Sequence, residues 1–132
     1  GLALMKLISW DEKCPERKKD AEDLLFIMQK YEEAGNYDRL YGSAQDILME
    51  ENFDTRLAGI RLLGQDMAQI AAPETLAAVQ KIIRTETGEY SHYRLIIHML
   101  GGMISFGNKF DEILLFLGKL REGLLSSHEE YQ

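Results

Sequence analysis

The residue usage of this chain leaves little material for a β-sheet. It contains a single valine, Val79, and only four threonines, whereas leucine, alanine, glutamate and isoleucine are plentiful. Leucine, alanine and glutamate favour helices, and apolar side chains recur at steps of three and four residues along most of the chain, as on one face of a helix. We therefore predict an all-α fold, a bundle of about five to seven helices.

Helix-starting and helix-breaking residues divide the first third of this pattern. A first apolar segment covers residues 2–10, and a second amphipathic helix follows Pro15 and ends before Gly35. A shorter and less regular helix is expected over 37–50, with the pair Gly42-Ser43 as a weak point.

Further helices follow in the rest of the chain. Asp54 is a suitable N-cap for one helix, and Pro73 starts the second arm of a predicted αα-hairpin. Ser91 is the expected N-cap of another helix. The last helix carries one apolar stripe from Phe110 to Leu124.

Length and charge indicate one acidic domain. The 132 residues, 45% of them hydrophobic, fit a single helical domain, divided into a hairpin over 1–34, further helices over 35–127 and a tail over 128–132. A net charge of −7 argues against a general nucleic-acid-binding surface or a polybasic membrane anchor. The lone Cys14 and the absence of an apolar run of membrane-spanning length favour a cytoplasmic location.

The first residues are typical of a fragment. The sequence begins at Gly1, its first methionine is Met5, and no basic leader or cleavage site of a signal peptide precedes the apolar stretch. We therefore expect this helical domain to belong to a longer protein.

Charged side chains interrupt the apolar faces of the first two helices. At about 100° per residue, Asp20 falls inside the apolar arc of the second helix, Arg17 projects into that arc one turn earlier, and Asp23 lies at its edge. Lys6 is the only charged residue of segment 2–10. A charge at an inward-facing position must be paired or line a cavity, because burying it alone costs several kcal/mol.

Two interpretations of these charges remain open. The structural one is a buried Lys6–Asp20 or Arg17–Asp20 pair that fixes helix register. The functional one is a cleft wall facing a polyanionic substrate, where Lys18 and Lys19 would add positive potential; alternatively, these two lysines belong to a solvated face.

A family resemblance favours the cleft. The runs Leu4 to Trp10 and Arg17 to Leu24 resemble the fourth motif of the AbiEii/AbiGii-type nucleotidyltransferases, a branch of the DNA-polymerase-β-like superfamily known from bacterial toxin–antitoxin and abortive-infection systems. That motif has a Lys-Leu helix, a short charged link with an arginine, then Lys/Arg-Asp, two residues and Asp-Leu. The resemblance covers about the first thirty residues, and the helical remainder is similar to the C-terminal region of bacterial proteins of this group.

The resemblance implies a role for each residue of the motif. Lys6 and Asp20 correspond to a lysine and an aspartate beside the bound nucleotide, with Asp23 as a second acid. We expect Lys6 to contact phosphate or stabilise the leaving group, Asp20 to orient Lys6 or the nucleotide, and Arg17 and Lys19 to support the anion. It also implies a nucleoside triphosphate with Mg²⁺ as substrate and a cognate antitoxin as candidate partner.

The metal-binding motif of the family is not found in this sequence. In the family, the metal ligands follow a Gly-Ser turn on a sheet as Asp-x-Asp. Here Gly42-Ser43 is followed by Asp46, but Leu48 stands where the second acid should be, in a helical context. We therefore expect a catalytic sheet domain upstream and no catalysis by these 132 residues alone.

The runner-up function is a non-catalytic helical protein-interaction module. Its apolar stripe or acidic surface would dock a partner, and Lys6 and Asp20 would be a structural pair. Metal binding is not expected, because His92, His98 and His128 lack ligand-like spacing. General DNA binding is disfavoured by the net charge and by the lack of a basic recognition helix.

Overall fold

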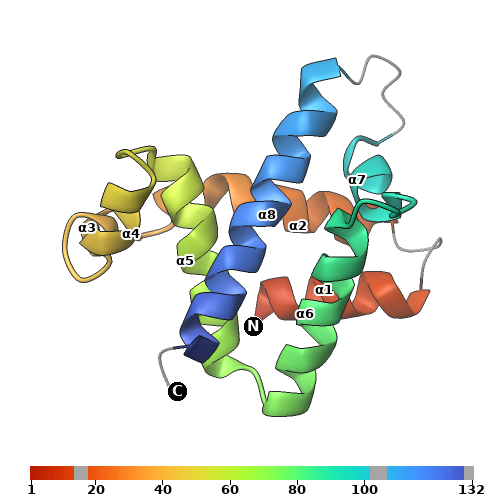
Figure 1. Cartoon of the computed structure of the whole chain (residues 1–132), viewed down its shortest axis with the longest axis horizontal. Coiled ribbons are helices and arrows are strands. Elements are labelled where there is room, and N and C mark those ends of the chain that lie inside the picture. The colour runs from red at the N-terminus through yellow and green to blue at the C-terminus, as the bar shows by residue number, and fades with distance from the viewer. Residues whose placement is uncertain (14–17, 102–106, 130–132) are drawn as a thin grey trace.

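The computed structural model of this chain describes residues 1–13, 18–101 and 107–129. These residues form eight α-helices, one 3-10 turn and no strand, which confirms the all-α prediction. The elements are α1 (Leu2–Lys13), α2 (Lys18–Lys30), η1 (Tyr31–Glu33), α3 (Tyr37–Leu40), α4 (Gln45–Glu50), α5 (Thr55–Ile70), α6 (Pro73–Thr87), α7 (Arg94–Met99) and α8 (Gly107–Glu129). Figure 1 shows their arrangement. Among these helices, none combines the length and the apolar character of a bilayer-spanning segment.

The helices α1 and α2 pack against each other as an antiparallel pair. Lys6 of α1 lies opposite Asp23 of α2, and Ala3, one turn earlier, lies near Ile27, one turn later. The residues that the pair buries are spaced by three or four positions, as an amphipathic helix requires. They are Ala3, Leu4, Leu7 and Trp10 of α1 and Ala21, Leu24 and Met28 of α2.

Two short helices, α3 and α4, replace the single helix expected over 37–50. The chain turns at 41–44, where the sequence has its predicted weak point. A Cβ atom on Gly42 would lie 2.9 Å from the backbone oxygen of Asp38, so this turn favours glycine. The two helices form a lobe at the left edge of Figure 1. Their small core is made of Leu40, Ala44, Ile47 and Leu48, packed on Ala58 and Leu62 of α5.

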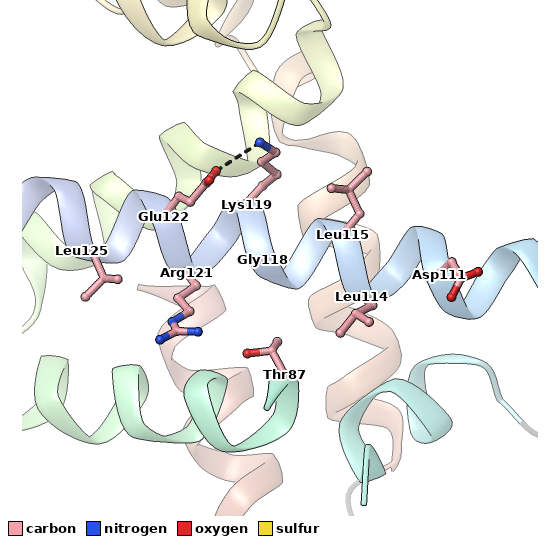
Figure 2. Close-up of a pocket in the computed structure, with 9 residues that line it drawn as sticks. All are labelled: Thr87, Asp111, Leu114, Leu115, Gly118, Lys119, Arg121, Glu122 and Leu125. Carbon is pink, nitrogen blue, oxygen red and sulfur yellow. Dashed lines mark ion pairs between the residues drawn. The ribbon is translucent and has the colours of Figure 1, made fainter. Parts of the chain in front are cut away.

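The longest helix, α8, lies between α5 and α6 (Figure 1). It runs parallel to α5, since residues 54–57 lie near residues 112–116, and Gly64 lies near Gly123. It is antiparallel to α6, since the amide of Gln80 donates to the backbone oxygen of Leu124 near the end of α8, while Thr87, at the end of α6, lies opposite the middle of α8 (Figure 2). The predicted αα-hairpin of α5 and α6 is therefore not a closed pair, because its two arms pack mainly on α8. The backbone of α8 continues to Glu129, beyond the start of the expected tail.

Two of the predicted helix starts are confirmed. The carboxylate of Asp54 accepts a hydrogen bond from the backbone N–H of Leu57 at 3.1 Å, which caps α5. Pro73 occupies the first position of α6, where its missing N–H leaves no intrahelical bond unmade.

The predicted N-cap of α7 is wrong. This helix begins at Arg94, after Tyr93 in a left-handed conformation with φ of 54°, and Ser91 accepts instead from the N–H of Tyr93. The N–H of Leu95 donates to the buried carboxylate of Glu86 at 2.9 Å. A side chain of the preceding helix thus caps α7, and local sequence rules do not detect such a long-range cap.

Candidate functional site

The predicted charges meet where α1 and α2 face each other. The ammonium group of Lys6 lies 2.8 Å from a carboxylate oxygen of Asp23 and 3.4 Å from one of Asp20. Asp20 is mostly buried, with 9% of its side chain exposed, whereas the side chains of Lys6 and Asp23 are 26% and 28% exposed. The inner side of the cluster, at Asp20, is therefore buried, and its outer side is open to solvent.

The site residues of the sequence prediction differ in their placement. The structure brings together Lys6, Asp20, Asp23 and Lys19, whose ammonium group lies 3.1 Å from the second carboxylate oxygen of Asp23. The side chain of Lys19 is 82% exposed, so it lies at the solvent edge of the cluster. Arg17 lies outside the described residues. Of the two carboxylates, Asp23 makes the shorter contact with Lys6, although the sequence pattern emphasised Asp20.

The ion pairs keep the lysine charged. The hydrogen bond to Asp23 raises the pKa of Lys6 above its ordinary value, against a smaller opposing effect of desolvation. The same hydrogen bond, followed by that from Lys19, lowers the pKa of Asp23. At neutral pH Lys6 is therefore an ammonium group that can donate to an anion, and it cannot serve as a general base. The formal charges of this cluster sum to zero over Lys6, Lys19, Asp20 and Asp23. An anion bound here would therefore share the ammonium group of Lys6 with the two carboxylates.

A partly buried hydrogen bond holds α1 against α7. The indole N–H of Trp10, one turn after Lys6, donates to Nδ1 of His98 on α7 at 2.8 Å, and the two rings meet edge to face. Desolvation, followed by the charges of Lys18 and Arg94, lowers the pKa of His98, so the neutral ring accepts this bond. The sequence prediction gave His98 no role, and the structure makes it the partner of Trp10.

A second group of charges was not predicted. Arg39 makes two hydrogen bonds of 2.8 Å to the carboxylate of Asp66, which also accepts from the hydroxyl of Tyr31. Burial, followed by the hydrogen bond to Asp66, raises the pKa of Tyr31 to about 12. Burial alone would raise the pKa of Asp66, but the bonds from Arg39 and Tyr31 hold it below its ordinary value. This group ties α3 to α5 and to η1, which is a structural role.

Glu51 forms a third group, at the junction of α4, α5 and α8. Its carboxylate, only 7% exposed, accepts hydrogen bonds from Arg61 at 3.1 Å and from Lys119 at 3.0 Å. Glu50 also accepts from Arg61, at 2.9 Å, but its side chain is 60% exposed. The two neighbouring glutamates thus share one arginine in different surroundings.

This difference gives a matched test of the Glu51 network. Glu51→Ala should lower the free energy of unfolding by about 2 kcal/mol, because it leaves two partly buried cations without their shared carboxylate. Glu50→Ala should lower it by less than about 1 kcal/mol, since an exposed ion pair contributes little. Urea denaturation followed by circular dichroism measures both, and equal losses would contradict a special role for Glu51.

Within the ranges that the structure describes, no group of three or more histidine, cysteine, aspartate or glutamate side chains is arranged to hold a metal ion. Asp20 and Asp23 both contact Lys6, so they do not form the paired carboxylate site that nucleotidyl transfer requires. What the cluster offers chemically is a positioned, charged lysine at a partly open surface. No family model, curated protein or solved structure matches this chain.

Proposed function

We propose that this chain is the C-terminal helical domain of a nucleotidyltransferase and that its α1–α2 face forms one wall of the nucleotide site. The observation that supports this most is the meeting of Lys6 with Asp20 and Asp23. These residues come from separate helices, in the order that the family motif implies, and their cluster is partly open to solvent.

The proposed role of Lys6 follows from its charge. In nucleotidyl transfer an acceptor oxygen attacks the α-phosphorus, a new P–O bond forms, and the bond to the departing pyrophosphate breaks. Negative charge develops on the leaving group, and a positioned ammonium donor stabilises it. Asp20 and Asp23 hold Lys6 at the surface, and Lys19 adds positive potential at the solvent edge.

The proposal assigns metal binding to another part of the protein. Mg²⁺, when bound, neutralises charge on the triphosphate. Since Asp20 and Asp23 are occupied by Lys6, the carboxylates that bind the ion would belong to the sheet domain that the resemblance implies. These 132 residues alone are then expected to bind a nucleotide weakly and not to catalyse transfer.

An NMR titration of the isotopically labelled chain with a nucleoside triphosphate tests the site. The side-chain ammonium signals of Lys6 and Lys19 should shift, because phosphate oxygens would become additional acceptors. Lys30 is the control, because it lies at the far end of the same helix as Lys19 and is also paired, with Glu33 at 3.7 Å. Absence of a shift at Lys6, or an equal shift at Lys30, would contradict the proposal.

A second candidate is a non-catalytic interaction module, favoured by apolar side chains that α1 and α2 expose. Leu2, Met5 and Phe26 are each more than half exposed. Such side chains suit contact with another protein surface. In this case Lys6 and Asp20 would be structural only, and the titration would leave Lys6 unshifted.

A further inference from the structure

An open groove of about 690 Å³ follows α8 beside the C-terminal end of α6 (Figure 2). It lies away from the Lys6 cluster and shares none of its residues. Its lining residues are Thr87, Asp111, Leu114, Leu115, Gly118, Lys119, Arg121, Glu122 and Leu125. Figure 2 shows Thr87 on α6 and all the others on α8.

The α8 side of the groove is one helix face centred on Gly118. At about 100° per residue, Asp111, Leu114, Arg121 and Leu125 all fall within about 60° of Gly118 around the helix. A Cβ atom on Gly118 would meet no other atom within 4 Å. By contrast, Gly123 on another face of α8 lies directly against the backbone of α5. Thus α8 has two glycine-centred faces, of which one is filled by α5 and the other is open.

The open face carries Asp111 at one end and Arg121 at the other, and Glu122 beside Arg121 is paired with Lys119 at 3.2 Å. Asp111 and Arg121 are ten positions apart, which is about 15 Å along a helix, too far for them to pair with each other. Neither forms an ion pair with another residue in the described part of the chain. The face between them has an apolar side chain at Leu114 and a hollow at Gly118.

We propose that this face binds the same face of a second copy, in an antiparallel dimer with its two-fold axis at the level of position 116 along α8. In this register Leu114 of each copy lies over Gly118 of the other, and Asp111 of each copy lies opposite Arg121 of the other. Positions 114 and 118 lie equally far from position 116, and so do positions 111 and 121. A two-fold axis at that level therefore relates both pairs. The complementarity of charge and of shape selects a second copy as the occupant. A single helix pair buries less than the roughly 1,200 Å² of a standard interface, so the dimer is weak.

Charge reversal tests the register directly. Sedimentation velocity of the wild-type chain over a range of concentrations should show a monomer–dimer equilibrium. Asp111→Arg makes both ends of the face positive, and Arg121→Asp makes both ends negative. Each variant alone would place two like-charged pairs in the dimer, so it should dimerise at least about tenfold more weakly than the wild type. An equimolar mixture of the two variants should dimerise again, because the positive ends of one variant then face the negative ends of the other.

Gly118→Gln provides a second test that does not depend on charge. The glutamine side chain has open space in the monomer, and glutamine favours a helix more than glycine does, so the variant should unfold at or above the wild-type temperature. In the dimer the same side chain would fill the hollow that receives Leu114, so self-association should be lost. A wild-type chain that stays monomeric would overturn the proposal and leave the groove to a different protein helix or a small ligand. Dimerisation that neither the charge reversals nor Gly118→Gln weaken would overturn it as well, by placing the interface elsewhere.

Discussion

Gly123→Ala should lower the free energy of unfolding by about 3 kcal/mol or more, the largest single-residue stability loss that we expect in this chain. A Cβ atom there would overlap the backbone oxygen of Arg61 and lie 3.0 Å from the backbone nitrogen of Gln65. These are backbone atoms of α5, so no flexible side chain can move aside. The two helices would have to separate, and the core between them would lose packing contacts.

Two further glycines make this prediction specific. Gly64→Ala should be similarly destabilising, since its Cβ atom would overlap the backbone oxygen of Leu120 and lie 2.9 Å from the backbone nitrogen of Leu124. Gly118→Ala is the matched control on α8, because its Cβ atom meets nothing and alanine favours the helix by up to about 1 kcal/mol. Urea denaturation compares the three variants. Equal stability of Gly123→Ala and Gly118→Ala would show that α5 and α8 do not need this close approach.

The helices of this fold could be predicted because their signals are local. The apolar stripes of α2 and α8, the Asp54 cap and Pro73 each act within one or two turns of the chain, and the structure confirms them. The single helix expected over 37–50 breaks where Gly42-Ser43 weakens the pattern. Local signals thus locate helices well and also indicate where they break.

The packing of the helices could not be predicted in the same way. The cap of α7 comes from Glu86, and the partners of Glu51 lie ten and sixty-eight positions away. Nothing in a helical wheel shows that α8 enters between α5 and α6. The glycines Gly64 and Gly123, where α5 contacts α8, are a signal that could have been used. Glycine lowers the stability of a helix, so a glycine within a helix indicates a place where another backbone comes close.

The candidate site was only partly predictable. Charges that interrupt an apolar stripe pointed to Lys6 and Asp20, and the structure brings both together with Asp23. The wheel placed Asp23 at the edge of the arc, yet it makes the shorter contact, because a long lysine side chain reaches past the buried Asp20 toward solvent. The link between Trp10 and His98 joins residues 88 positions apart and has no local signal.

The central claim is that Lys6 acts on a nucleotide, and the most direct test is nucleotidyl transfer by the longer protein that we propose, in which this chain follows a catalytic sheet domain. Lys6→Met should reduce transfer of label from a nucleoside triphosphate by at least about 100-fold, the typical cost of removing one donor that stabilises a transition state. Lys6→Met should also lose stability, because it takes Lys6 away from the mostly buried Asp20, so transfer is measured under conditions where circular dichroism shows the variant to be fully folded. Lys30→Met is the control, because this lysine is paired on α2 outside the cluster and its loss should leave transfer unchanged. Transfer by Lys6→Met at the wild-type rate would contradict the claim, as would an equal loss in both variants.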